Sequence, residues 1–233
     1  MRNLYLAAGV ILFIEILISP NFLPVFTLTG KAADSVATLG PSIVSIIARE
    51  SEVPNTVSGI IFKNRLYDTI FEVVVFTLSI MGVRFLLSDE QPASNIRQFT
   101  DYPSIVLTKL GATIAALIAV ELAIRGHLSP GGGFAAGVAG GTAIGLVVIV
   151  SDAKLMETIY QRWRASTLEK VSVLIFIALS ALSLSGLMVP NLVPPDTLLY
   201  GGWIPLLNIL VAIKVALGSW SAVLLFIRYR GLL

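Results

Sequence analysis

Long apolar runs constrain the fold of this chain more than any other feature of its sequence. They occupy residues 4–26, 66–87, 104–124, 133–150, 171–189 and 204–227. A helix needs about 20 residues to cross a hydrocarbon layer about 30 Å thick. Because the runs are continuously apolar and do not alternate, they favour helices over the strands of a barrel. The sequence therefore predicts an all-α integral membrane protein with about six transmembrane helices.

The composition supports this class and excludes others. Apolar residues make up 56% of the chain and charged residues 13%, where a soluble domain carries roughly 25%. The basic residues are scattered between apolar runs, so the predicted surroundings are a lipid bilayer and not nucleic acid. With no cysteine and one histidine, we expect no cofactor in this chain, neither an iron–sulfur cluster, a thiolate zinc site nor a c-type haem. Any redox chemistry must then belong to a partner.

The polar segment 88–103 divides the chain into two helices followed by four. The predicted domains are residues 1–95 and 96–233. Residues 27–64 are expected to form an external loop that carries an interfacial amphipathic helix. The first run follows Arg2 as in a signal peptide, but it contains Glu15 and lacks a small-residue cleavage pattern, so we expect it to be retained.

Basic residues indicate the orientation. They lie in the segment before the fifth run (Lys154, Arg162, Arg164 and Lys170), in the C-terminal tail (Arg228 and Arg230) and at the start of the chain (Arg2). With six spans all of these lie on one side, and the positive-inside rule makes that side cytoplasmic. The sequence thus predicts a multi-pass protein with cytoplasmic termini.

A glycine stripe marks the fourth run. Gly133, Gly137, Gly141 and Gly145 recur every fourth residue, so one helical face is nearly free of side chains and another helix can approach closely. We expect this stripe to serve helix packing. The triplet that begins at Gly131 is no phosphate loop, because no Lys-Ser/Thr pair follows it.

Lys214 is the most deeply placed charge in the apolar runs, at roughly 13 Å from Pro205 along a helix axis. An ammonium at this depth is costly unless it pairs, loses its proton or reaches water, so a functional role is the default interpretation. Asn208 falls on the opposite side of the helix. The fifth run, residues 171–189, is expected to carry hydroxyl groups as its only polar side chains.

The second run carries Asp68 and Glu72 on one helical face. The alternative for Asp68 is a structural role in the first helical turn, beside Arg65. Glu72 lies deeper, so we favour a functional role for it. Arg84, near the far end, fits an interfacial anchor.

The remaining candidates each have two interpretations. Glu121 is either an ion-pathway group or the partner of Arg125 at the membrane surface. Lys109 can extend its long stem to the interface, and Glu15 stands close to the break at Pro20. His127, just outside the third run, titrates near neutrality, although a lone histidine in a turn is usually structural.

The segment 125–134 reads R-G-H-L-S-P-G-G-G-F and resembles the loop and glycine-rich helix of the MrpB component of Mrp-type multisubunit Na⁺/H⁺ antiporters. The resemblance extends from about Ile105 to the C-terminus and includes Asn208 and Lys214. It implies a membrane subunit with other Mrp-like membrane subunits as partners.

A second stretch, V-P-N at 53–55 through R-L-Y-D-T-I-F-E at 65–72, is similar to the C-terminal part of the large MrpA component. It also resembles the small separate protein that replaces that part in archaeal membrane-bound hydrogenases. Phe71 stands where that family usually has glycine. A fusion of the two modules implies a respiratory relative, with iron–sulfur redox subunits as possible further partners.

The resemblance implies a non-catalytic subunit of a cation-translocating module in a prokaryotic plasma membrane, with Na⁺ and H⁺ as the transported ions. The expected pathway residues are Lys214, Glu72, Asp68, Glu121, Lys109, His127 and Glu15. Membership of a stand-alone antiporter and a purely structural spacer role are the alternatives. An independent transporter is disfavoured, because the two halves are not similar.

Overall fold

The computed structural model describes residues 42–93, 96, 99, 101–185, 197–198 and 200–231. Residues 1–45 and 46–233 form two units, and each is described by itself. The predicted first span, residues 4–26, and its Glu15 lie outside the described residues.

Five helices in the described part are long and apolar enough to cross a membrane. They are α5 (Leu66–Leu86), α6 (Tyr102–Arg125), α7 (Gly133–Val150), α9 (Ala165–Leu184) and α10 (Ile204–Arg230). Shorter helices are α3 (Ile43–Ser51), α4 (Thr56–Gly59), the π-helix η2 (Ile60–Asn64) and α8 (Ala153–Arg162). The predicted all-α membrane fold is confirmed, and these described ranges contain no strand.

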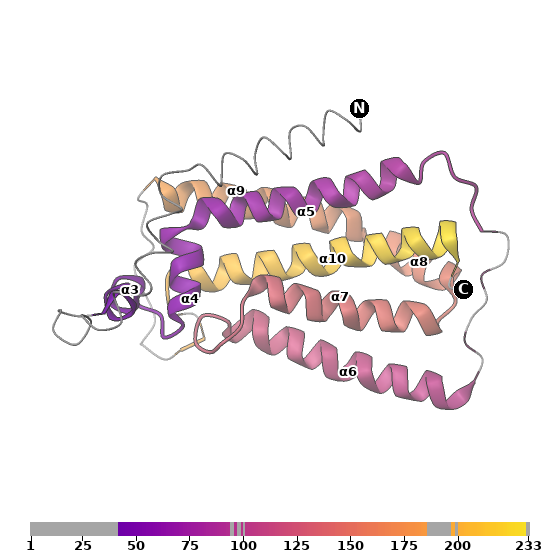
Figure 1. The fold of residues 1–233 in the computed structure, drawn as a ribbon, viewed down its shortest axis with the longest axis horizontal. Helices are drawn as coiled ribbons and strands as arrows, with labels where there is room; N and C mark the ends of the chain where they lie inside the picture. The colour runs from indigo at the N-terminus through magenta and orange to yellow at the C-terminus, as the bar shows by residue number, and fades with distance from the viewer. Residues whose placement is uncertain are drawn as a thin grey trace, which may run out of the picture. The chain divides into compact units, whose positions relative to one another are not determined.

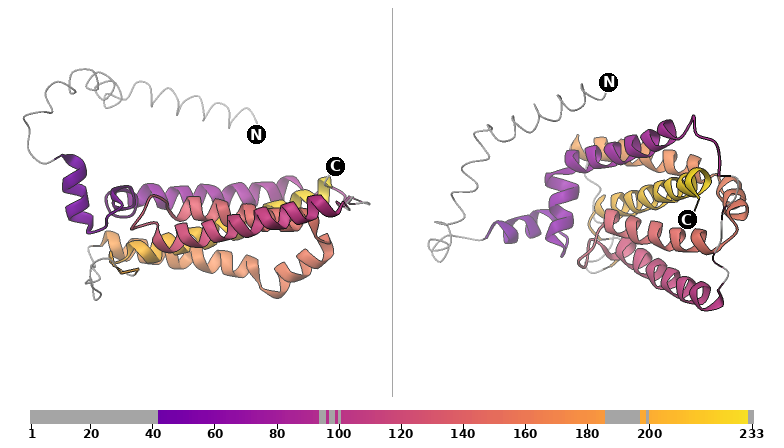
Figure 2. Two further views of the ribbon diagram at one scale, coloured as in Figure 1. Left: turned by 90° about the horizontal axis from the view of Figure 1, so that it is seen from below. Right: turned by 45° about the vertical axis from the view of Figure 1, so that its right-hand side comes forward.

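Helix α10 is the centre of the second unit. It packs against α7, α9 and α5, while α6 lies along the other side of α7 (Figure 1; Figure 2, right). Leu66 and Val73 of α5 meet Phe176 of α9 and Val211 of α10 in the main apolar core. Both predicted modules therefore contribute to one core. The proposed boundary near residue 95 stays a prediction.

Local sequence explains where the helices begin. The Asp101 carboxylate accepts a hydrogen bond from the Ser104 amide at 3.2 Å, and Pro103 fits the first turn of α6. Asp152 caps α8 through the Lys154 amide at 2.8 Å. A capping carboxylate satisfies amides that have no partner within the helix.

The fifth span begins earlier than the apolar run predicts. Helix α8 ends at Arg162, Arg164 adopts a left-handed conformation with φ of 49°, and α9 starts at Ala165. The prediction of a span from about residue 171 with hydroxyls as its only polar groups is wrong, because Glu169 lies inside α9. A charged residue lowers the local apolarity, so the apolar run in the sequence does not include the first turns of this helix.

Candidate intramembrane charge site

Lys214 lies in the middle of the central helix. It is ten residues after the start of α10, about 15 Å along the helix axis. Its side chain is 1% exposed. A charge buried at this depth costs several kcal/mol unless another group compensates it.

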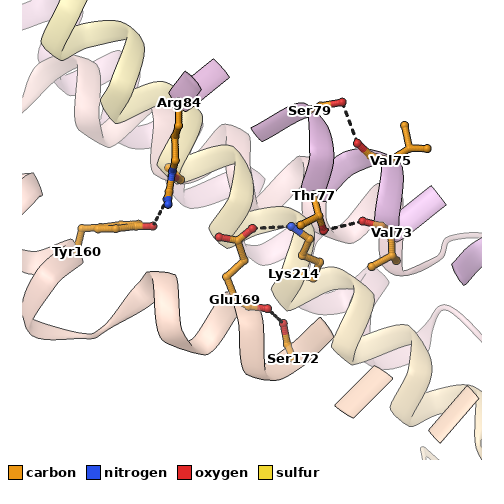
Figure 3. Close-up of polar contacts among 10 residues, drawn as sticks. Val73, Val75, Thr77, Ser79, Arg84, Tyr160, Glu169, Ser172 and Lys214 are labelled. Carbon is orange, nitrogen blue, oxygen red and sulfur yellow. Dashed lines mark hydrogen bonds and ion pairs between the residues drawn. The ribbon is translucent and has the colours of Figure 1, made fainter. Parts of the chain in front are cut away.

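Glu169 of α9 supplies that compensation. Its Oε1 lies 2.5 Å from Lys214 Nζ, and its side chain is 8% exposed (Figure 3). The pair joins two different transmembrane helices. Charge-assisted hydrogen bonds of this kind are short and strong, and both partners here are removed from water.

Other side chains close the space around the pair. The Phe76 ring of α5 lies 4.9 Å from Lys214 Nζ, within the range of a cation–π interaction. Gly218 stands one helical turn after Lys214, and a Cβ there would lie 3.3 Å from Glu169 Oε1 and 2.6 Å from Phe76 Cε1. The missing side chain at Gly218 therefore makes room for the ring and the carboxylate.

Glu169 is not among the residues predicted from the sequence, although a signal for it exists. The buried residues of α9 are Ala165, Glu169, Ser172, Phe176 and Ser180. Their spacing of three and four is that of one helical face, and most of them are small or polar. Reading this face one turn further toward the N-terminus from Ser172 would have placed a carboxylate on the buried side of the fifth span.

The glycine stripe of α7 lies against the helix that carries Lys214. A Cβ on Gly133 would overlap the Asn208 carbonyl oxygen, one on Gly137 would overlap Val215, and one on Gly141 would lie 2.6 Å from Ser219 Cβ. Gly145 is looser, with Val223 at 3.7 Å. The stripe thus sets how closely α7 and α10 approach.

The loop between α6 and α7 is held by polar side chains from both predicted modules. Asn55 Nδ2 donates to the Gly126 and Ser129 carbonyls at 2.6 and 2.9 Å, and Ser58 Oγ donates to Gly126 at 2.7 Å. Asn208 of α10 donates to the Ala123 carbonyl at 2.8 Å. Asn208 therefore secures the end of α6 and does not contact Lys214.

His127 lies within this loop and is fully buried. Neither ring nitrogen has a hydrogen-bond partner among the described residues. Burial lowers the pKa of the imidazole, because the charged form would lose its hydration. The neutral form is therefore the one that the fold favours.

The other predicted pathway residues do not join Lys214. Glu72 is exposed on α5 and Lys109 on α6, and neither side chain makes an ion pair within the described part of the chain. Asp68 pairs with Arg65, and Glu121 lies 3.5 Å from Arg125 Nε on an exposed surface. For Asp68 and Glu121 the structure thus contains the ion pairs with Arg65 and Arg125 that were the alternatives to a pathway role.

Comparison with known proteins identifies the family. A family model described as a domain related to the MnhB subunit of Na⁺/H⁺ antiporters matches residues 103–221, more than half of the chain. The chain belongs to this family. The predicted resemblance to the MrpB component is confirmed, and the chain is a membrane subunit of antiporter-like type. No curated protein matches it.

Two solved structures share the fold of this MnhB-related chain. One is a chain of the membrane-bound sulfane sulfur reductase, an archaeal respiratory membrane complex, with a TM-score of 0.66 and 21% identity over 89% of this chain and 97% of that one. The other is from the Mrp complex of Dietzia sp. DQ12-45-1b, with a TM-score of 0.57 and 17% identity. That match covers 89% of this chain and 25% of the Dietzia chain.

Proposed function

We propose that this chain is a non-catalytic subunit of a Na⁺/H⁺ antiporter-type membrane module, and that its Glu169–Lys214 pair contributes to the cation pathway. The observation that carries the proposal is the burial of this pair between two packed transmembrane helices, with Lys214 near the middle of α10 and Glu169 one turn inside the start of α9. Ionisable groups inside a membrane are expensive and mark ion or proton routes more often than they serve stability.

The geometry gives the pair a chemical role. A proton or Na⁺ that reaches the Glu169 carboxylate competes with the Lys214 ammonium for the same oxygen. When the cation binds, Lys214 loses its partner and must release a proton, turn toward another acid or remain unpaired at high cost. Occupancy of Glu169 is thereby coupled to the charge and position of Lys214, which neighbouring subunits can sense electrostatically.

A silent structural pair is the competing function. Removal of one partner from a buried pair costs about 3–5 kcal/mol, so single variants can fail to assemble for structural reasons alone. Replacement of both partners by apolar residues of similar volume is often neutral. The double variant Lys214→Met with Glu169→Met therefore separates the two functions.

The test uses the whole complex in vesicles, with Na⁺-dependent proton movement measured by a pH-sensitive dye. We expect the double variant to assemble and to lose most of its transport. Lys109→Met is the matched control, since Lys109 is also a lysine of a transmembrane helix but is exposed. Normal transport by an assembled double variant would assign the pair to structure.

We further propose that the complex is a redox-driven respiratory one. The sulfane sulfur reductase chain supports this, because the matched region is nearly all of that chain, whereas in the Mrp complex it is a quarter of a longer chain. Iron–sulfur proteins should then co-purify with this chain in mild detergent and give an electron paramagnetic resonance signal on reduction. A complete antiporter preparation without iron would indicate a stand-alone Mrp assembly instead.

A further inference from the structure

A cavity of about 350 Å³ lies where α5, α8 and α10 come together, near the last turns of α5 and α10. Its lining includes Arg84, Lys154, Glu157, Tyr160, Ser221 and Arg228. The Ala93 amide donates to the Arg228 carbonyl at 2.8 Å and closes one side. None of these groups belongs to the Glu169–Lys214 pair.

The charges of this cavity do not balance. Three cations and one carboxylate line it, and Glu157 is already engaged by Arg228 Nη1 at 2.9 Å. Within the described residues, Arg84 and Lys154 have no carboxylate within ion-pair distance. An excess of positive charge repels Na⁺, so this cavity does not suit the mouth of a cation route.

Arg84 points into the cavity and not outward as an interfacial anchor. Its Nη2 donates to Ser221 Oγ at 2.6 Å. It also donates to the Tyr160 hydroxyl at 3.5 Å (Figure 3). Tyr160 is fixed in turn by edge-on packing against Trp220, with ring centroids 5.1 Å apart. Since the two hydroxyls accept from Arg84, each can still donate its own proton, and the cluster presents donors to an anion.

The remaining wall is apolar. Leu224, Leu225 and Ile227 line the cavity beside these donors. We propose that the cavity binds a phosphate group, and that the phosphate is that of an anionic phospholipid whose hydrocarbon part covers the apolar wall. Arg84 Nη2 is engaged by Ser221 and Tyr160, so the Arg84 Nε and Nη1 groups and the Lys154 ammonium are the charged donors left for a phosphate. Basic pockets between transmembrane helices are suited to lipid headgroups.

The site lies at the ends of two membrane-spanning helices, where a lipid headgroup would reach it. Arg84 belongs to the last turn of α5 and Arg228 to the last turn of α10, while α8 is a short amphipathic helix beside them. A bound phosphate would add to the Arg84 hydrogen bonds that already join α5 to α8 and α10. This role is independent of the cation pathway.

The test compares equal losses of charge inside and outside the cavity. The complex carrying Arg84→Gln with Lys154→Gln is purified in mild detergent, and its retained phospholipids are quantified by mass spectrometry. Arg162→Gln with Arg164→Gln is the control, because neither residue lines the cavity. We expect anionic lipid to bind about fivefold more weakly for each cavity cation removed, with the control like the wild type.

Thermal shifts of the delipidated complex identify the source of the phosphate. Stabilisation by nanodiscs of phosphatidylglycerol but not of phosphatidylcholine, lost in the cavity variant, supports the lipid. Stabilisation by inorganic phosphate alone, with the same dependence on Arg84, supports a phosphate site filled from solution. Equal lipid retention and equal shifts in the cavity and control variants would overturn the proposal, whatever either variant does to transport.

Discussion

Helices α10 and α6 are both long apolar spans that carry a lysine, yet they have opposite surroundings. In the most apolar stretch of each, 44% of the residues of α10 are buried and 6% of those of α6. Lys214 is enclosed and paired, whereas Lys109 is exposed. The difference shows that the role of a charged residue in a transmembrane helix depends on the helices that pack around it.

Neighbouring small residues decide which span becomes central. The glycines of α7 admit the backbone of α10, and α9 and α5 cover its other sides. Helix α6 packs mainly along α7, so side chains such as Leu107, Leu117 and Val120 remain exposed. In a membrane these side chains face lipid or a partner protein, and Lys109 has no ion-pair partner within the described part of this chain.

The largest expected effect is the difference in stability between variants of the two lysines. Lys214→Ala should destabilise the complex by about 3–5 kcal/mol, because it leaves the Glu169 carboxylate buried without a cation. Lys109→Ala should change stability by about 0.5 kcal/mol or less, as at most exposed positions. Thermal unfolding of the two purified complexes measures the difference, and equal melting temperatures would break the comparison.

The second prediction compares a glycine of α7 that faces α10 with a glycine of α6 that faces α7. Gly137→Ala places a Cβ where it overlaps Val215 and lies 2.9 Å from the Ala212 oxygen, so α7 and α10 must separate. Overpacking of this kind costs about 1–3 kcal/mol.

Gly111→Ala on α6 is the matched control, since its Cβ would meet Leu146 at an ordinary 3.7 Å. Alanine favours a helix over glycine by about 1 kcal/mol, so this variant should be neutral or more stable. Unfolding in increasing denaturant gives both values. A stable Gly137→Ala complex would mean that the stripe does not set the helix separation.

The sequence predicts the spans better than it predicts the site. Span length follows from apolar run length, and for α7 the two agree in both ends because Gly133 and Ser151 bound an uncharged run. Lys214 stands out in the sequence because it lies deep within an apolar run, far from either end of the span. Glu169 stands out less: its spacing from Ser172 and Phe176 fits one helical face, but its pairing with Lys214 depends on packing against α10, which no local pattern contains.

His127 gives the third prediction, at the loop where α6 does meet α10 through Asn208. Burial lowers the pKa of His127, so the unfolded chain binds a proton more readily than the folded one. The stability due to neutral His127 is therefore present above pH of about 6.5 and is lost as the pH falls below it.

Melting temperatures between pH 8 and pH 5.5 test this sign. The wild-type complex should lose stability on acidification across this range, and the loss should be smaller in His127→Leu, which cannot take up the proton. Identical slopes of melting temperature against pH for the two complexes would assign the pH dependence to other groups, and His127 would then not titrate in this range.

The smallest effect is expected at the exposed end of α6. The side chains of Glu121 and Arg125 are 57% and 51% exposed and lie 3.5 Å apart. Glu121→Gln should therefore lower the stability by about 0.5 kcal/mol or less, and this loss should be smaller still in high salt. The measurement is the melting temperature of the complex at low and high ionic strength, beside Arg125→Gln as the reciprocal change. A loss as large as that of Lys214→Ala would mean that a partner protein buries Glu121. In that case α6 would be as enclosed in the complex as α10 is within the chain, and the contrast between the two helices would belong to the isolated chain only.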